Sequence, residues 1–291
     1  TMANLKEIRT RITSVESTMQ ITSAMKMVSA AKFKRAQDAI IQMRPFAKKF
    51  NDILLNVSSA VGETEHPMMR DDKGKKVLLI AISSNRGLCG GFNNNVVKEI
   101  KKTIEENPEN EYSILTIGKK VFDAFKKTEL LNSNERLPAD AQTIWDDLNY
   151  ENTISITSKL MSAFENNVFD KAFLIYNSFK NAAVQITVNE RFLPVVPDQS
   201  ETESSVDYIF EPDQEEILKE LIPSSLKIQL YKALLDSFAS EHGARMTAMH
   251  KATDNANEMK NDLKLFYNKA RQAAITNEIL EIVAGAEALG G

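Results

Sequence analysis

The chain has 291 residues, of which 43% are hydrophobic and 26% are charged, and its formal net charge is −4 at pH 7. This composition is that of an ordinary globular protein with enough apolar residues for a core, and the negative charge excludes a generally basic nucleic-acid binder. The single cysteine, Cys89, excludes a disulfide within the chain and fits a reducing compartment.

The first predicted element is a long helix that begins near Asn4 and ends at Gly62. Mostly apolar side chains recur along it at alternating steps of three and four residues: Leu5, Ile8, Ile12, Val15, Met19, Thr22, Lys26, Ser29, Phe33, Ala36, Ile40 and Met43. A mean spacing of about 3.5 residues keeps one stripe facing a partner helix, as in a coiled coil. Pro45 is expected to kink or loosen the helix. The polar positions from Thr22 to Ser29 predict weak packing in that stretch.

The middle of the chain predicts a layered α/β domain. The continuous apolar run at 77–82 indicates a strand buried on both faces of a parallel sheet. Further strands are expected at 112–117, 171–176 and 183–188, and helices at 93–106, 119–127 and 151–164. Strands that alternate with helices are typical of βαβ units.

A second long helix is expected from residue 213 onwards, with a break and restart at 223–225. Its apolar series is Met249, Ala252, Ala256, Met259, Leu263, Phe266, Ala270 and Ala273. Two such helices on either side of a compact domain predict an antiparallel pair. The predicted fold class is therefore α/β plus a long antiparallel coiled coil, with a central layered, Rossmann-like α/β domain. The expected divisions are 1–62 and 213–291 for the coiled-coil helices and 63–212 for the α/β domain.

Charge is unevenly distributed along the chain. Residues 1–60 carry ten Lys/Arg against four Asp/Glu, whereas residues 61–223 carry eighteen against twenty-eight. A basic first helix predicts attraction to an acidic protein surface. Binding of nucleic acid through Lys32, Lys34 and Arg35 is an alternative, but no stacking aromatics accompany these residues, so we expect no nucleic-acid partner.

The residues that carry candidate chemistry form no catalytic or metal-binding pattern. The glycines of 87–91 follow a strand and precede a helix, but their spacing matches neither the dinucleotide fingerprint nor the phosphate-loop motif. Cys89 lacks an activating base. His242 and His250 are eight residues apart, too far to share a metal on one helix turn, and are expected to be solvated or to flank the helix seam. We therefore expect no catalytic residue, cofactor or metal, although a small-molecule enzyme that uses the α/β domain remains an alternative.

Several stretches resemble the gamma subunit of the bacterial F-type ATP synthase. Residues 21–32 (ITSAMKMVSAAK) resemble its first-helix motif, and residues 83–93 (SSNRGLCGGFN) resemble its central glycine-rich turn. Residues 241–246 (EHGARM) and 270–278 (ARQAAITNE) are similar to its last helix. These matches are spread along the whole chain.

The resemblance implies a non-catalytic central rotor stalk. Such a subunit transmits torque between the membrane ring and the catalytic head, couples proton flow to ATP synthesis or hydrolysis, and regulates ATPase activity. Its expected partners are the alpha and beta subunits of the head, the epsilon subunit and the ring of c subunits. The expected location is the cytoplasmic face of the bacterial inner membrane, with membrane association only through partners.

The resemblance also assigns contact residues. Those expected to meet the catalytic subunits are Met25, Lys26, Arg245, Arg271, Gln272, Thr276 and Glu278. Those expected to meet the membrane ring are Tyr208, Phe210 and Glu211.

Overall fold

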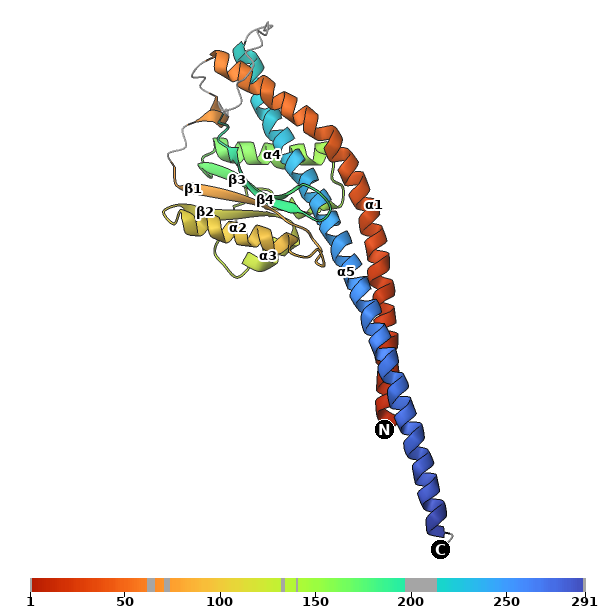
Figure 1. Cartoon of the computed structure of the whole chain (residues 1–291). Helices are drawn as coiled ribbons and strands as arrows, with labels where there is room; N and C mark the ends of the chain where they lie inside the picture. The colour runs from red at the N-terminus through yellow and green to blue at the C-terminus, as the bar shows by residue number, and fades with distance from the viewer. Residues whose placement is uncertain are drawn as a thin grey trace. The chain divides into compact units, whose positions relative to one another are not determined.

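The computed structural model describes residues 2–61, 66–70, 74–131, 134–139, 141–196 and 214–289 (Figure 1). The elements are, in chain order, α1 (Met2–Val61), η1 (Pro67–Met69), β1 (Lys76–Ile82), α2 (Phe92–Glu106), β2 (Glu111–Ile117), α3 (Lys119–Phe125), η2 (Ala141–Trp145), α4 (Tyr150–Glu165), β3 (Lys171–Phe179), β4 (Gln185–Leu193) and α5 (Gln214–Leu289). The chain divides into two compact units: residues 1–29 with 246–291, the helix-pair unit, and residues 30–245, the α/β unit. The domain boundaries expected from the sequence remain a prediction.

A four-stranded mixed sheet in the order β2-β1-β3-β4 organises the α/β unit. β1 runs parallel to both of its neighbours, β2 and β3, and β4 pairs antiparallel with β3. The sheet places β1 between two strands, which explains why its sequence is a continuous apolar run. The predicted combination of a layered α/β domain with long terminal helices is confirmed.

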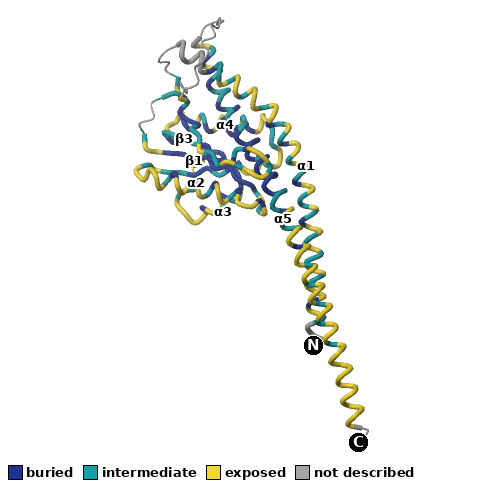
Figure 2. The backbone as a smooth tube through the Cα atoms, in the orientation of Figure 1, coloured by how far each residue is buried: buried dark blue, intermediate teal, exposed yellow. Residues whose placement is uncertain are grey.

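The two faces of β1 belong to separate cores, because successive side chains of a strand point to opposite sides of the sheet. Leu79 and Ala81 lie in a core that α2 and α3 complete. Leu78, Ile80 and Ile82 lie in a larger core with residues of α4 and α5. Figure 2 shows the resulting buried centre along the strands. The layers are thus α2 and α3 on one side of the sheet and α4 and α5 on the other.

Helix α5 runs without interruption from Gln214 to Leu289 and includes Pro223. The expected break at 223–225 is therefore wrong. Proline removes one backbone donor and disfavours a helix interior. Here Ile222 and Leu226, which flank Pro223, are fully buried in the larger core. Core packing has overruled the local preference of the sequence.

The turn between β2 and α3 passes very close to the end of β1. Ser83 donates its backbone N–H to the Ile117 carbonyl at 2.9 Å, and its side-chain Oγ accepts from the Val121 N–H at 3.2 Å. Gly118 lies between these contacts with φ at 129°, and a Cβ there would be 2.0 Å from the Ser83 carbonyl oxygen. Only glycine fits this approach.

In the helix-pair unit α1 and α5 pack side by side in antiparallel directions. Side-chain contacts across the pair join Arg9 with Tyr267 at 2.7 Å, Glu16 with Lys264 at 3.6 Å, Thr22 with Thr253 at 2.8 Å and Lys26 with His250 at 3.3 Å. Numbers rise on one helix as they fall on the other, which confirms the predicted antiparallel pairing. The polar stretch of the seam makes its own hydrogen bonds across the pair.

The predicted stripe matches α1 but only part of α5. In α1 all twelve predicted positions are buried or half-buried. In α5 the predicted positions Met259, Phe266 and Ala273 are exposed, and their neighbours Lys260, Tyr267 and Ala274 are half-buried instead. After Ala256 the seam advances by four residues to Lys260, whose aliphatic stem can cover apolar surface. The prediction selected the more apolar residue, so at these three places it chose the residue directly before the one that lies in the seam.

Candidate interaction surfaces

The glycine-rich turn that follows β1 is held by its own side chains. Asn93 accepts the Ser84 backbone N–H at 3.0 Å, and its amide donates to Ser84 Oγ at 2.9 Å and to Cys89 Sγ at 3.2 Å. Leu88 and Gly90 adopt positive φ angles of 63° and 60°. Since Asn93 is the second residue of α2, these bonds tie the end of β1 to the start of that helix. The exposed Leu88 side chain lies at the tip of the turn.

Cys89 has the environment of a structural thiol. It is buried with Phe92 and Ala244. Burial raises the pKa of the Cys89 thiol, and the opposing effects of Arg245 and of the Ser84 hydroxyl do not overcome it. The thiol therefore stays protonated at neutral pH, whereas a nucleophilic cysteine needs thiolate character.

Arg245 of α5 binds the carbonyls of the glycine-rich turn. Its Nη2 donates to the carbonyl oxygens of Arg86 and Gly87, each at 3.1 Å, and its Nε donates to Gly87 at 3.3 Å. Its Nη1 donates to Glu241 Oε1 at 2.6 Å, one helical turn earlier. The residue is only 7% exposed. We refer to Arg86, Gly87, Glu241 and Arg245 as the turn clamp.

A second attachment of α5 lies at the end of β3. Asp236, which is 1% exposed, accepts from Arg44 Nη2 at 2.7 Å and from the Phe179 backbone N–H at 3.4 Å. The same Arg44 nitrogen donates to the Phe179 carbonyl at 2.5 Å. The carboxylate thus joins α5 to both α1 and β3 within the α/β unit.

His242 lies next to the turn clamp and is held in its neutral form. Its ring meets Phe238 edge-to-face with the centroids 4.5 Å apart. Burial lowers the pKa of His242 to about 3, and the positive charges of Arg245 and Lys32 act in the same direction. Of the two alternatives expected for the histidines, a solvated side chain is wrong for His242, which is buried. His250 is exposed and contacts Lys26 across the helix pair.

This neutral histidine predicts a loss of stability in mild acid. The unfolded state takes up a proton near the usual pKa of 6.5, but folded His242 does so only near pH 3, so stability falls as the pH drops through this window. At pH 5 the free energy of unfolding should be lower than at pH 7 by about 2 kcal/mol from this residue. Urea unfolding of wild type and of His242→Gln at both pH values measures it. His250→Gln is the matched control, and equal acid losses in wild type and His242→Gln would contradict the prediction.

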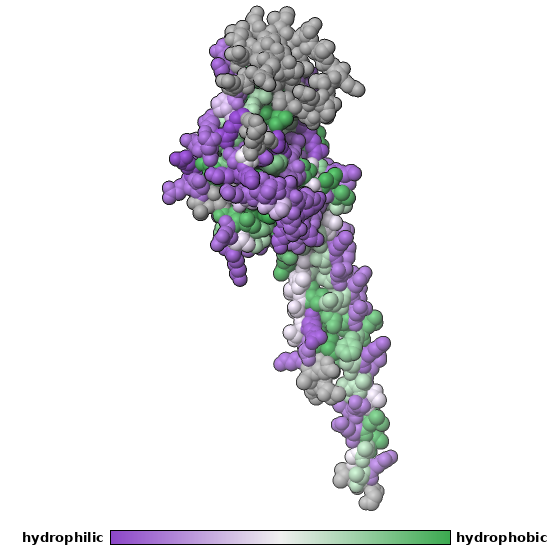
Figure 3. All heavy atoms as spheres, turned by 90° about the vertical axis from the view of Figure 1, so that its left-hand side faces the viewer, coloured by the Kyte–Doolittle hydropathy of each residue, from purple (hydrophilic) through white to green (hydrophobic). Residues whose placement is uncertain are grey.

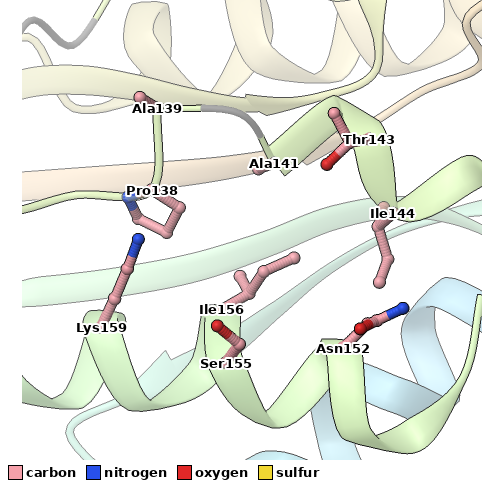
Figure 4. Close-up of a pocket in the computed structure, with 9 residues that line it drawn as sticks. All are labelled: Pro138, Ala139, Ala141, Thr143, Ile144, Asn152, Ser155, Ile156 and Lys159. Carbon is pink, nitrogen blue, oxygen red and sulfur yellow. The ribbon is translucent and has the colours of Figure 1, made fainter.

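A shallow hollow of about 320 Å³ lies between η2 and α4 (Figure 4). Thr143, Ile144, Asn152, Ser155 and Lys159 contribute to its walls. The Asn152 amide is already bound to the Asp147 carbonyl at 2.9 Å, and none of the described residues that line the hollow carries a carboxylate. Within the described ranges, no group of three or more His, Cys, Asp or Glu side chains is arranged to hold a metal ion.

The predicted contact residues lie in three environments. Met25 and Lys26 are half-buried in the helix pair, whereas Arg271, Gln272, Thr276 and Glu278 are exposed on α5. Arg245 is buried in the turn clamp, so its guanidinium is already engaged within the chain. Tyr208, Phe210 and Glu211 lie outside the described residues. All of these contacts with partners remain predictions.

The terminal part of α5 exposes an apolar stripe that the sequence reasoning missed. Every residue from 275 to 288 is exposed. Ile275, Ile279 and Ile282 recur at steps of four and three residues, and Ile282 is 71% exposed. Figure 3 shows hydrophobic atoms at the surface of this end of the helix. The helical spacing of these three isoleucines could have revealed the stripe in the sequence, but the predicted apolar series ended at Ala273. Among the described residues, none of the helices combines the length and the apolar composition needed to span a lipid bilayer.

These features define a class of protein that combines an α/β unit, built on a four-stranded mixed sheet, with a unit of two long antiparallel helices. A family model described as ATP synthase matches residues 4–289. The ATP synthase gamma chain of Flavobacterium johnsoniae is 59% identical and that of Christiangramia forsetii 54% identical, each over the full length of both chains. The chain belongs to the ATP synthase gamma-chain family, which confirms the resemblance found in its motifs.

Solved structures share the fold. A chain of the Euglena gracilis mitochondrial ATP synthase, solved with OSCP, F1 and c-ring, matches with a TM-score of 0.66 and 20% identity, covering 99% of this chain and 95% of that one. A chain of the Tetrahymena thermophila central stalk and c-ring structure matches with a TM-score of 0.56 and 25% identity, covering 80% and 99%.

Proposed function

We propose that this chain is the non-catalytic central rotor subunit of a bacterial F-type ATP synthase. It transmits torque between the membrane ring and the catalytic head, couples proton flow to ATP synthesis and hydrolysis, and regulates ATPase activity. Membership of the gamma-chain family over nearly the full length supports this proposal. ATP turnover itself belongs to the partner subunits, to which the chain contributes contacts and no reacting group.

The observation that carries the proposal is the exposed apolar stripe of α5. Large apolar side chains at helical spacing on a surface indicate a partner that covers them. The predicted contacts Arg271, Gln272, Thr276 and Glu278 lie on the same segment. The apolar stripe is therefore presented together with three residues that can donate hydrogen bonds to carboxylates and with one carboxylate that can accept them. A rotating helix with unequal sides offers each surrounding subunit a different face, and such differential contact is what shifts a conformational equilibrium.

The proposed partners are the alpha and beta subunits around the helix pair, the epsilon subunit, and the ring of c subunits. Contact with the ring is assigned to Tyr208, Phe210 and Glu211. The proposed location is the cytoplasmic face of the inner membrane, with attachment only through partners. The Euglena and Tetrahymena structures, which contain a c-ring with their matching chains, support a shared assembly.

Reconstitution of the head subunits with and without this chain tests the proposal. The chain alone should hydrolyse no ATP, and its addition to alpha and beta subunits should restore turnover. The combined change Arg271→Glu with Ile275→Asp and Ile279→Asp should reduce that turnover at least tenfold, because it removes both the cation and the apolar stripe. Lys269→Glu, a charge reversal on the opposite side of the helix, is the matched control. Full turnover by the triple variant, or no effect of adding the wild-type chain, would count against the proposal.

A further inference from the structure

Helix α5 covers the part of the sheet where open α/β proteins usually bind ligands. Because β2 and β3 lie on either side of β1, the chain changes direction between β1 and β3, and ligands typically bind outside the carboxyl ends of the strands at such a point. Here Asp236 binds Phe179, the last residue of β3, and Arg245 binds the turn that follows β1. The helix therefore bridges both strand ends.

In the turn clamp the cation is the Arg245 guanidinium, and acceptor groups of the same chain surround it. Two backbone carbonyls and the Glu241 carboxylate accept hydrogen bonds from the Arg245 guanidinium, whose Nη1 also lies 3.5 Å from His242 Nδ1. The planar fork of an arginine matches several acceptors at once, and hydrogen bonds from a charged donor are among the stronger ones in proteins. Since Gly87 and Arg245 are 158 residues apart in the sequence, the clamp joins two distant segments of the α/β unit.

The two attachments hold α5 from different sides. Asp236 and Arg245 are nine residues apart, which corresponds to about 13 Å along a helix and places them on roughly opposite sides of it, at about 3.6 residues per turn. Core packing already holds this part of α5. Polar attachments on two sides and at two heights add to that packing, because rotation of the helix about its axis must break at least one of them.

We infer that Arg245 is a positioning residue for torque transfer, which locks α5 to the glycine-rich turn against rotation about the helix axis. The inference rests on the proposed function. Arg245 is the last residue of the α/β unit on α5, and the helix-pair unit begins at the next residue. The lock therefore acts at the last residue that α5 contributes to the α/β unit. Glu241 fixes the direction of the guanidinium from one turn away.

Three variants separate the parts of the clamp. Arg245→Met removes every donor, whereas Arg245→Lys keeps a cation that can reach a carbonyl. The exchange Glu241→Arg with Arg245→Glu keeps an ion pair four residues apart but places no donor opposite the turn. A clamp built on the carbonyls predicts that the exchanged pair behaves like Arg245→Met. If the ion pair between residues 241 and 245 only stabilises the helix, the exchanged pair should behave like wild type.

Amide hydrogen exchange on the isolated chain tests the lock without any partner. The amides of Ser84 and Phe92, which are bonded to Asn93 and to the Cys89 carbonyl, should exchange at least tenfold faster in Arg245→Met and in the exchanged pair, and less so in Arg245→Lys. The reason is that the turn loses its bonds to α5 and opens more often. Protection of β1 and β3 shows in the same experiment that each variant is folded. If a variant fails to fold, Glu241→Gln and Arg245→Lys decide the outcome. Unchanged exchange in the turn would overturn the inference. The predicted contact with the catalytic subunits would then be the remaining role for Arg245.

The assembled complex in vesicles tests the consequence. The number of protons transported per ATP hydrolysed should fall at least threefold for Arg245→Met and for the exchanged pair, and stay near wild type for Arg245→Lys. Lys251→Met, an exposed change on the same helix, should leave the ratio unchanged. A wild-type ratio in Arg245→Met or in the exchanged pair would overturn the inference. Failure of the wild-type chain to couple transport to hydrolysis would instead overturn the proposed function, while the exchange experiment would still report on the clamp.

Discussion

Replacement of Gly118 by alanine is expected to destabilise the α/β unit by about 3 kcal/mol or more. An added Cβ would lie 2.0 Å from the Ser83 carbonyl oxygen and 2.6 Å from its carbonyl carbon, and backbone atoms cannot move aside as a flexible side chain does. The φ angle of 129° adds strain for any residue with a Cβ. Relief requires the ends of β1 and β2 to separate, which breaks the bond from Ser83 to Ile117. Urea unfolding followed by circular dichroism gives the free-energy change.

Gly285→Ala is the matched control for this prediction. Gly285 lies inside α5, and a Cβ there meets no atom within 4 Å. Alanine should therefore favour the helix by up to about 1 kcal/mol. A Gly118→Ala variant within about 1 kcal/mol of wild type would contradict the steric explanation.

Arg44→Met should lower the free energy of unfolding by about 3 kcal/mol, because it leaves the Asp236 carboxylate buried with a single long hydrogen bond. The Asp236 side chain is 2% exposed, whereas that of Arg44 is 44% exposed, so water can partly replace the guanidinium and the loss falls at the low end of the range for buried pairs. Thermal and urea unfolding of the isolated chain measure the loss.

A double-mutant cycle isolates this pair. Arg44→Lys keeps a cation near the carboxylate and should cost about 1 kcal/mol through the lost bond to Phe179. Combining Arg44→Met with Asp236→Leu removes both charges and should recover most of the loss, because replacing a buried pair by apolar residues is often neutral. If the free-energy losses of Arg44→Met and Asp236→Leu simply add, the two side chains are not coupled. The ion pair would then not attach α5 to α1.

Much of the fold follows from sequence patterns that act locally. The apolar run at 77–82 is short and rich in β-branched residues, which favours a strand covered on both faces, and β1 is that strand. The stripe of α1 is regular because residues three and four apart share a helix face. The stripe of α5 was partly misplaced, because Met259 and Lys260 are adjacent and hydrophobicity alone favours Met259, which is exposed.

The interactions that could not be predicted join distant segments. Neither the pairing of Arg245 with the carbonyls of Arg86 and Gly87 nor that of Asp236 with Arg44 leaves a periodic signal in the sequence. The burial of His242 has the same origin, since it depends on the position of α5 in the α/β unit. Pro223 was misjudged because a local rule was applied where core burial decides. Only the family resemblance singled out Arg245, and it assigned that residue to a partner.

The hydroxyl pair formed by Thr22 and Thr253 limits longitudinal slip of the two paired helices. Smooth apolar stripes would let one helix slide along the other by a full heptad and find equivalent partners. Such a displacement here separates the two hydroxyls, which keep their bonds to the Met19 and Met249 carbonyls of their own helices, and so loses one part-buried hydrogen bond across the pair, worth about 0.5–1.5 kcal/mol. This contact therefore favours one axial register of the antiparallel pair over its heptad-shifted alternatives.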